Sequence, residues 1–328
     1  MRAAAYEKTG LAHEVLKVIE VQTPRPGPGE VRVKIQWSGV NPSDVKSRAG
    51  MRVKTLAFPR IIPHSDGSGV IDEIGAGVPK DRIGESVWVW NAAWQRPFGS
   101  AAEYVVLPAH QAVRLPAGTS PEAGACLGIP AWTAYHAVRV DGGVTGQSVL
   151  IAGGAGAVGH YAIQFAKLAG AKQILATVSG AEKTAVAKGA GAHATVNYKS
   201  EDVVARVKEL TGGRGVDRVI EVDMAGNMNL DHQIITPDGK IVVYGSNAAE
   251  TPVPFFPMIV KNIGMRFFIV YNLSQRDREQ ETHELLDILE KKVLTHHIAA
   301  RLPLEKIADA HVLVEQGKVI GNVVVSIP

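Results

Sequence analysis

The sequence holds 328 residues, enough for about two domains, because single hydrophobic cores stop growing at about 250–300 residues. Lysine and arginine number 35 and aspartate and glutamate 32, a formal net charge of +3 that favours neither nucleic acid nor an anionic membrane as a partner. No apolar run approaches the ~20 residues of a membrane span, and the first residues lack a signal-peptide core, so we expect a cytoplasmic protein. The single cysteine, Cys126, excludes an internal disulfide, and we expect it to be a small buried side chain.

The first third of the chain predicts short strands separated by prolines and glycines. The clearest strands lie at 31–35, 69–74, 86–90 and 102–106, and each is rich in valine, isoleucine or tryptophan. Such spacing is typical of a compact antiparallel barrel and not of alternating strands and helices.

From about Pro121 the pattern changes, and helical segments alternate with apolar strands. The predicted strands lie at 149–152, 173–178, 194–196, 218–222 and 240–244. This alternation is typical of a doubly wound parallel sheet. A charged helix over 276–292 and a helix ending at Gly317 then lead to a final strand at 321–327, which we expect to pair with the amino-terminal barrel.

The strand at 149–152 runs into a helix through glycines spaced Gly-x-Gly-x-x-Gly. We expect Gly154 to take the tight turn, Gly156 to let the backbone approach a pyrophosphate, and Gly159 to let the helix pack against its strand. A strand before the motif and an alanine-rich helix after it are the context that the motif requires, so the sequence predicts a nicotinamide dinucleotide. A glycine-rich turn without a ligand is the alternative.

The end of the next strand predicts which dinucleotide is bound. Sites for NAD usually carry Asp or Glu about 20 residues after the glycine turn, where the carboxylate binds ribose hydroxyls. Here that position is Ser179, and Lys183 follows one helical turn later. A hydroxyl and a cation in place of a carboxylate suit a 2′-phosphate, so the sequence favours NADPH.

Several segments together carry a family resemblance. They include Ser-Gly-Val-Asn-Pro-Ser-Asp at 38–44, Pro-His-Ser-Asp-Gly-Ser-Gly-Val at 63–70, and the segments 101–104, 128–135, 220–222 and 243–246, with the glycine turn between them. In order and content they resemble the zinc-independent quinone oxidoreductases of the medium-chain dehydrogenase/reductase superfamily, the group that includes zeta-crystallin. The resemblance implies an α/β protein with a GroES-like antiparallel β-barrel domain (1–123 and 270–328) and a Rossmann domain, a doubly wound parallel sheet (124–269).

The resemblance also implies which residues would contact NADPH. They are Ala155, Gly156, Ala157, Val158, Gly159, Ser179, Lys183, Tyr198, Asn227, Gly245, Ser246, Asn247, Phe267, Phe268, Ile269 and Thr133. Three of them have simpler interpretations: Tyr198 as a loop aromatic, Asn227 as a turn residue, and Thr133 as a buried helix residue.

Zinc-dependent relatives bind a catalytic ion through Cys, His and Cys. At the aligned positions this chain offers Asn41 and Ser65, while His64 occupies the usual glycine position, so we expect no metal. Without a metal, hydride transfer needs another group that stabilises negative charge on the substrate oxygen, and the Asn41 amide is the candidate catalytic donor. The alternative is that Asn41 only holds its own Asn-Pro turn.

The predicted activity is NADPH-dependent reduction of quinones by hydride transfer without zinc. Met51 and Trp94, together with Asn41, are the candidate substrate contacts. The favoured alternative for Trp90 and Trp94 is that they are core residues of the barrel. The alternatives are reduction of α,β-unsaturated carbonyls, or a crystallin-like or RNA-binding structural protein with little turnover. A homodimer or homotetramer is expected, for which the apolar run 263–270 offers an edge strand.

Overall fold

The structure is a computed structural model that describes residues 1–51 and 55–328 and divides the chain into two compact units. The barrel unit contains Met1–Pro130 and Thr282–Pro328, and the dinucleotide unit contains Ala131–Glu281. Both limits lie later in the chain than the expected boundaries after residues 123 and 269. None of the helices in the described ranges is long and apolar enough to cross a membrane.

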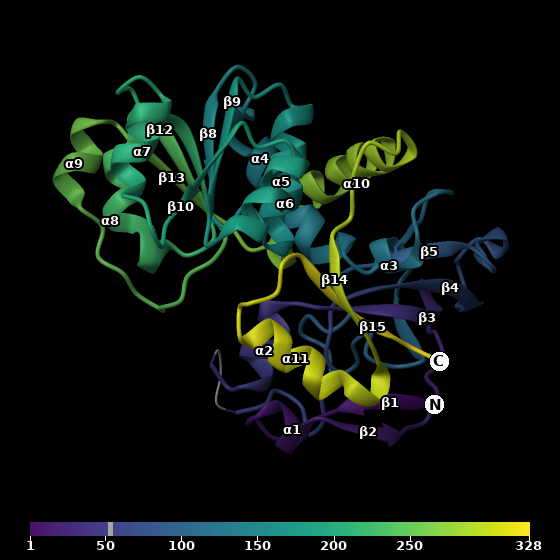
Figure 1. Cartoon of the computed structure of the whole chain (residues 1–328). Helices are drawn as coiled ribbons and strands as arrows, with labels where there is room; N and C mark the ends of the chain where they lie inside the picture. Colours follow the sequence, from purple (N-terminus) through teal and green to yellow (C-terminus); the bar gives the residue numbers. More distant parts are fainter. Residues whose placement is uncertain (52–54) are drawn as a thin grey trace. The chain divides into compact units, whose positions relative to one another are not determined.

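The barrel unit is built on a seven-stranded sheet with the order β14-β15-β3-β4-β5-β7, in which β6 also pairs with β3 (Figure 1). Its strands are β3 (Glu30–Val40), β4 (Asp66–Ile74), β5 (Ser86–Val89), β6 (Tyr104–Pro108), β7 (Ala112–Arg114), β14 (Ile298–Pro303) and β15 (Asn322–Ser326), and a separate antiparallel pair is formed by β1 (Arg2–Ala5) and β2 (Lys17–Glu20). The pairings of the large sheet are antiparallel, as predicted, except that β14 and β15 run parallel, which the sequence did not indicate.

Alternating burial on β3 shows why this segment forms a strand of the barrel. Val31, Val33 and Ile35 are buried in the core, while the side chains between them point away from it. Val323 and Val325 of β15 belong to the same core, and β15 pairs antiparallel with β3. The predicted pairing of the final strand with the barrel is therefore confirmed.

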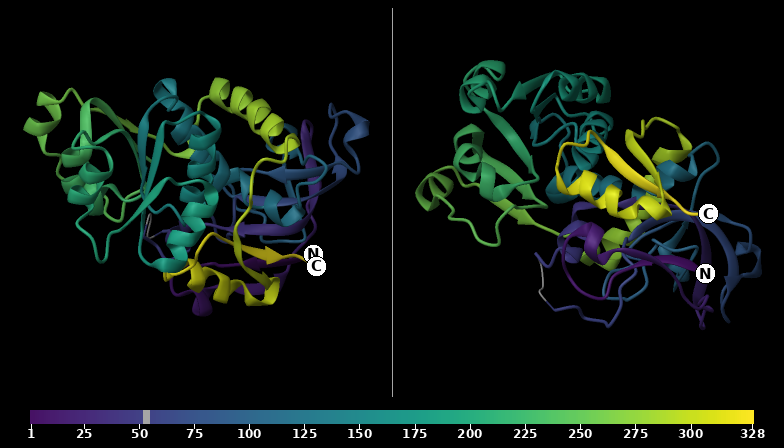
Figure 2. Two further views of the ribbon diagram at one scale, coloured as in Figure 1. Left: turned by 45° about the horizontal axis from the view of Figure 1, so that its top comes forward. Right: turned by 60° about the horizontal axis from the view of Figure 1, so that its bottom comes forward.

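Short helices cover the barrel unit. They are α1 (Ala12–Val15), α2 (Pro42–Arg48), α3 (Pro121–Gly124) and α11 (Ile307–Glu315). Helix α11 lies against β15, α1 and α2. The two ends of the chain lie close together on this unit in both figures (Figures 1 and 2).

The dinucleotide unit contains a six-stranded parallel sheet with the order β10-β9-β8-β11-β12-β13. Its strands are β8 (Ser148–Ile151), β9 (Gln173–Val178), β10 (Ala194–Asn197), β11 (Val216–Glu221), β12 (Ile235–Val243) and β13 (Gly264–Phe267). In chain order this is 3-2-1-4-5-6, the doubly wound arrangement of dinucleotide-binding proteins. The predicted parallel sheet is confirmed.

Helices cover both faces of this sheet (Figure 1). On one face lie α4 (Trp132–Arg139), α5 (Ala157–Leu168) and α6 (Ala181–Ala190), and on the other α7 (Val203–Leu210) and α8 (Met224–Ile234). Helix α9 (Phe255–Val260) connects β12 to β13, and α10 (Gln275–Glu290) follows β13. Because helices cover both faces, the central strand β8 is fully buried along its length.

Candidate functional site

The glycine turn between β8 and α5 has the close packing that the sequence predicts, with one correction. The left-handed backbone conformation lies at Gly153 (φ 67°) and not at Gly154. A Cβ on Gly154 would lie 2.5 Å from the Cβ of Ala176 on the neighbouring strand β9, so this glycine is required for packing. A Cβ on Gly159 would lie 2.2 Å from the carbonyl oxygen of Gly153, so α5 packs directly on the turn, as predicted.

The start of α5 is arranged to receive an anion. Gly156 caps the helix, and its carbonyl accepts the first intrahelical hydrogen bond from the His160 N–H (3.0 Å). The amides of Ala157, Val158 and Gly159 precede that bond, and in this position backbone N–H groups and the helix dipole favour a phosphate. A Cβ on Gly156 would meet only the Gly153 carbonyl oxygen, at 3.2 Å, so its outer side is open to a close ligand.

Thr177 holds the turn in place, a role that the sequence analysis missed. Its hydroxyl oxygen accepts a hydrogen bond from the Gly153 N–H (3.0 Å), and its carbonyl accepts one from the Gly154 N–H (3.0 Å). Ala155, predicted as a cofactor contact, is buried just beyond these glycines. A threonine near the end of the strand after a glycine turn was the available signal, but many strands contain such a residue.

The residues predicted to recognise the adenosine phosphate lie at the ends of two neighbouring parallel strands. Ser179 follows β9, Tyr198 follows β10, and the Tyr198 N–H donates to the Val178 carbonyl (3.1 Å). The Tyr198 side chain is 53% exposed, and Lys183 lies in the first turn of α6. The structure thus brings Ser179 and Tyr198 to one edge of the sheet, with Lys183 on the helix that begins there.

Acid and amide side chains form a network at the ends of β11 and β12. Glu221 Oε1 accepts a hydrogen bond from Asn227 Nδ2 (2.9 Å) and another from the Asp223 backbone N–H. The Asp223 carboxylate accepts from the backbone N–H (2.8 Å) and from Nδ2 (2.9 Å) of Asn247. Both predicted amides are therefore held by carboxylates that the sequence analysis did not assign.

Gly245 and Ser246 lie in the loop after β12, directly before Asn247 of this network. A Cβ on Gly245 would lie 2.2 Å from the Val222 carbonyl oxygen, so only glycine fits there. The Ser246 hydroxyl accepts a hydrogen bond from the Ala248 N–H (3.2 Å). The close approach at Gly245 keeps the loop after β12 directly against the loop after β11.

A second acid, Asp231 on α8, is buried beside Glu221. Burial, the neighbouring Glu221 carboxylate and the hydrogen bond between the two acids together raise the pKa of Asp231 to about 9. Burial also raises the pKa of Glu221, against the hydrogen bonds from Asp223 and Asn227. With a pKa of about 9, the Asp231 carboxyl is protonated at neutral pH.

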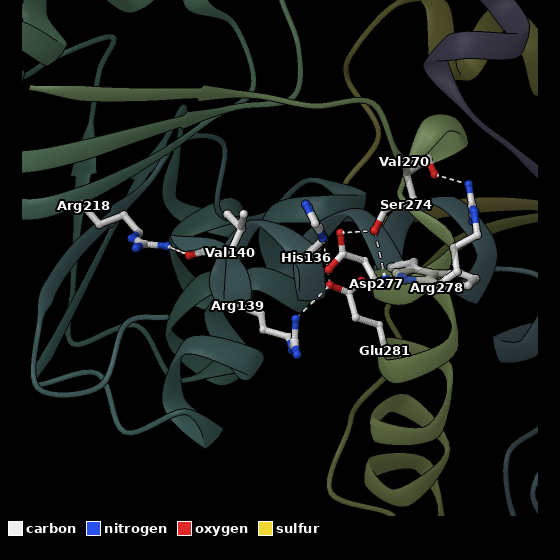
Figure 3. Close-up of polar contacts among 10 residues, drawn as sticks. His136, Arg139, Val140, Arg218, Val270, Ser274, Asp277, Arg278 and Glu281 are labelled. Carbon is white, nitrogen blue, oxygen red and sulfur yellow. Dashed lines mark hydrogen bonds and ion pairs between the residues drawn. The ribbon is translucent and has the colours of Figure 1, made fainter. Parts of the chain in front are cut away.

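The end of β13 and the two residues that follow it carry the predicted nicotinamide contacts Phe267, Phe268 and Ile269. The Phe268 N–H donates to the Val243 carbonyl (3.2 Å), and the Phe268 ring packs on His136 with a centroid distance of 4.6 Å. Just beyond, Arg278 donates to the carbonyls of Val270 (2.6 Å) and Tyr271 (2.7 Å), and Figure 3 shows the first of these contacts. The backbone of this segment is thus held on both sides.

A buried carboxylate fixes helix α4, which carries the predicted contact Thr133. Glu281 on α10 accepts hydrogen bonds from Trp132 Nε1 (2.8 Å) and His136 Nδ1 (2.8 Å), and Arg139 lies 3.6 Å away (Figure 3). Glu281 is completely buried, and Thr133 is nearly so. The sequence shows Glu281 only as one of many acids in a charged helix, so its position could not be foreseen.

In the barrel unit, Asn41 is the N-cap of α2 and is nearly buried. Its backbone N–H donates to Asp44 Oδ2 (2.8 Å), and its side chain faces the Asp44 backbone N–H in turn, which forms a capping box. Its Nδ2 also donates to Asp66 Oδ2 (2.8 Å). Asn41 therefore does hold its own turn, and the amide retains one further N–H beyond the bond to Asp66.

His64, next to the ligand-position residue Ser65, bonds through both ring nitrogens to other side chains. His64 adopts a left-handed backbone conformation (φ 75°), as suits a position usually held by glycine. Its Nδ1 bonds to the Ser38 hydroxyl (2.8 Å) and its Nε2 to His311 Nε2 (2.9 Å), and burial lowers the pKa of His64 to about 3. Within residues 1–51 and 55–328, no three His, Cys, Asp or Glu side chains form a group that could hold a metal.

The candidate substrate contacts Met51 and Trp94 differ in exposure. Met51 is 67% exposed at the end of the first described range, and Trp94 is partly buried. Trp90 is nearly buried in the barrel unit. Cys126 is buried as expected, and burial raises the pKa of its thiol.

Two family models match the chain. Residues 27–117 match the alcohol dehydrogenase GroES-like domain, and residues 157–291 match the zinc-binding dehydrogenase family. A quinone oxidoreductase of Homo sapiens is 30% identical over 302 residues, which cover 91% of this chain and 89% of the relative. A 2-haloacrylate reductase of a Burkholderia species is 28% identical over 337 residues, which cover 99% of this chain and 98% of the relative.

Solved structures agree with the sequence relatives. The quinone oxidoreductase of Escherichia coli, solved in complex with NADPH, superimposes with a TM-score of 0.89 at 25% identity and covers 100% of both chains. The GroES-like barrel domain and the Rossmann domain that the resemblance implied are both confirmed. By its family models, relatives and fold, the chain belongs to the medium-chain dehydrogenase/reductase superfamily and is an NAD(P)-dependent oxidoreductase of the quinone oxidoreductase type.

Proposed function

We propose that the chain is an NADPH-dependent reductase whose preferred substrates are quinones. The cofactor assignment rests on the end of β9, where Ser179 replaces the carboxylate that would bind ribose hydroxyls and would repel a 2′-phosphate. The E. coli quinone oxidoreductase, which shares this fold, was solved with NADPH bound. The glycine turn, the open start of α5 and the held backbone after β13 provide the remaining contacts that a dinucleotide requires.

Bound NADPH supplies a hydride to the acceptor. The chain itself must then stabilise the negative charge that develops on the substrate oxygen, and we assign this role to the second amide N–H of Asn41. The poor fit of His64, Ser65 and Asn41 to zinc is why the proposed chemistry uses a hydrogen bond and not a metal. An acceptor whose reduced anion is delocalised suits such a site better than a simple ketone.

The single observation that carries this proposal is the Asn41 amide, which is fixed by Asp44 and Asp66 and retains a donor. The test is a panel of quinones, enals, simple ketones and alcohols assayed with NADPH or NADP⁺, before and after treatment with a chelator. We expect the fastest turnover with quinones and no loss after chelation. Faster oxidation of simple alcohols than reduction of quinones, or loss of activity together with stoichiometric zinc, would refute the proposal.

A second candidate substrate class is favoured by one relative. The 2-haloacrylate reductase matches nearly the whole chain, and its name describes reduction of a conjugated acid. A conjugated carbonyl also places negative charge on an oxygen after hydride addition, so the same Asn41 donor would serve it. Enals or acrylates that turn over faster than every quinone in the panel would establish this alternative.

We also propose that two copies of the chain pair through β13. This strand pairs only with β12 among the described strands, so its outer edge is available. Exposed apolar side chains lie on β13 and on the helix α9 that precedes it, namely Phe267, Phe255, Phe256, Ile259 and Val260. Antiparallel pairing of two β13 strands about a two-fold axis would satisfy the edge and cover these side chains.

Light scattering coupled to size-exclusion chromatography tests the pairing. We expect a dimer or larger assembly for the wild type and a smaller species for Phe256→Asp, because a buried carboxylate at the interface is costly. Phe98→Asp is the matched control, since Phe98 is also an exposed aromatic but lies in the barrel unit. A wild-type monomer, or equal effects of the two substitutions, would contradict the proposal.

A further inference from the structure

Asp66, the first residue of β4, has a carboxyl group that is enclosed by the protein. It is completely buried, and two glycines stand against it. A Cβ on Gly128 would lie 2.5 Å from Asp66 Oδ1, and a Cβ on Gly39 would lie 3.0 Å from Asp66 Cβ. The backbone of two other segments therefore packs directly on this side chain and restricts where its oxygens can lie.

The enclosed carboxyl binds the side-chain amide of Asn41. Asp66 Oδ2 accepts a hydrogen bond of 2.8 Å from Asn41 Nδ2, and both residues are buried. The capping box with Asp44 constrains Asn41 as well. The Asp44 carboxylate accepts a hydrogen bond from the Asn41 backbone N–H, and the Asn41 side chain faces the Asp44 backbone N–H. The amide of Asn41 is thus constrained at two points, and only one of them, Asp44, is required to cap the helix.

The charge of Asp66 decides whether this arrangement suits a reductase. An ionised carboxylate beside Asn41 would oppose negative charge on a substrate oxygen bound there. Burial raises the pKa of Asp66 well above its ordinary value, and the nearby Asp44 charge acts in the same direction, against the hydrogen bonds from Asn41 and from the Ile129 backbone. A neutral carboxyl still accepts the Asn41 N–H through its carbonyl oxygen, and it removes the unfavourable charge.

We infer that Asp66 is a positioning residue, which turns the Asn41 amide so that one N–H is bound internally and the other is offered to the substrate oxygen. The inference rests on the proposed role of Asn41 and extends it to a residue that does not touch substrate.

Replacement of Asp66 by a neutral isostere and by a truncated side chain separates orientation from charge. Asp66→Asn retains an acceptor oxygen in the same place, so we expect kcat with a quinone to stay within about twofold of wild type. Asp66→Ala removes the acceptor, and we expect kcat to fall about tenfold while KM for NADPH is unchanged. Asp66→Ser, too short to reach Asn41, replaces Asp66→Ala if that variant does not fold.

A double-mutant cycle shows whether Asp66 acts through Asn41. If it does, Asp66→Ala has little further effect on kcat in the Asn41→Ala background. Asp72→Asn is the matched control, because Asp72 is also a carboxylate on β4 but bonds to Arg32, and we expect its kcat to be that of wild type. Equal losses caused by Asp66→Ala in the wild-type and Asn41→Ala backgrounds would overturn the inference.

Crystal structures of Asp66→Ala and Asp66→Asn test the positioning role of Asp66 separately from the proposed catalytic role of Asn41. If Asn41→Ala retains wild-type turnover on every quinone, the proposed role of Asn41 fails, but the orientation of the Asn41 amide can still be measured. A rotated amide in Asp66→Ala and an unchanged amide in Asp66→Asn would support the positioning role. An unchanged amide in Asp66→Ala would overturn it.

Discussion

In the dinucleotide unit, the predicted contacts lie where parallel strands end and helices begin, and backbone groups and glycines make up much of the site. In the barrel unit, the important groups are buried side chains that bond to partners far along the chain. Asn41 bonds to Asp66, which is 25 positions away, and His64 bonds to His311, which is 247 positions away.

The difference shows which part of a site local sequence can specify. A glycine turn works through steric limits and backbone amides, and both are properties of consecutive residues. A buried hydrogen-bonded pair works only when the fold brings two separate segments together. We therefore expect cofactor binding by the dinucleotide unit to be sensitive to changes in backbone shape and charge. Turnover should be sensitive to the loss of single polar groups in the barrel unit.

The largest effect is expected from Asn41→Ala, which removes the proposed donor from the barrel unit. One such donor can contribute ~2.7–4 kcal/mol to a transition state, so we expect quinone turnover to fall about 10²-fold or more. The dissociation constant for NADPH, measured by fluorescence titration, should change little because the dinucleotide unit is untouched. A small decrease in turnover would mean that Asn41 serves only as the cap of α2.

Gly159→Ala tests the steric character of the dinucleotide unit. The added Cβ would lie 2.2 Å from the Gly153 carbonyl oxygen, so we expect a loss of about 1–3 kcal/mol in the free energy of unfolding and weaker NADPH binding. Gly189→Ala in α6 is the matched control, because a Cβ there meets nothing within 4 Å. Chemical denaturation should show no loss for Gly189→Ala, and equal losses in the two variants would contradict the steric account.

Ser179→Asp tests the charge at the end of β9. A carboxylate there would repel the 2′-phosphate, so we expect the preference for NADPH over NADH to fall about tenfold. Titration of both cofactors measures the effect, and Ser86→Asp, at an exposed serine of the barrel unit, serves as the control. Equal dissociation constants for the two cofactors in the wild type would show that the site does not recognise the 2′-phosphate.

The smallest effect concerns the buried pair of Glu221 and Asp231. Because the pKa of Asp231 is raised to about 9 in the folded protein, its contribution to stability is fully present below its unfolded value of 3.8 and is lost as pH rises through about 9. Asp231→Asn does not titrate, so the decrease in unfolding free energy between neutral pH and about pH 9 should become flatter. Asp238→Asn, at an exposed position of β12, should keep the wild-type slope, and a steeper slope in Asp231→Asn would contradict the assignment.

The sequence predicted the dinucleotide unit well because its signals are local. The strand, the glycine turn and the following helix appear as consecutive residues, although the left-handed conformation falls on Gly153 and not on Gly154. Gly154 is required for a different reason, because a Cβ there would lie 2.5 Å from the Cβ of Ala176 on another strand. Thr177, which holds the turn, was missed because its contact likewise joins the turn to another strand.

The candidate groups of the barrel unit were only partly predictable. Asn41 could be selected because of its place in a motif, but its bond to Asp66 depends on the pairing of β3 with β4. The parallel pairing of β14 with β15 and the contact between His64 and His311 likewise join distant segments. Periodicity gives no information on such pairs, since it reports which face of a strand is buried and not what lies opposite.

The place of β15 has a consequence for the order in which the protein is made. All six strands of the parallel sheet lie between residues 148 and 267, so the ribosome releases them before β15. Until residues 323–326 emerge, the part of β3 at 37–40, directly before Asn41, can pair with β4 but lacks its second neighbouring strand, β15. The nascent chain can therefore fold its cofactor unit before the strand leading to Asn41 gains its second neighbouring strand.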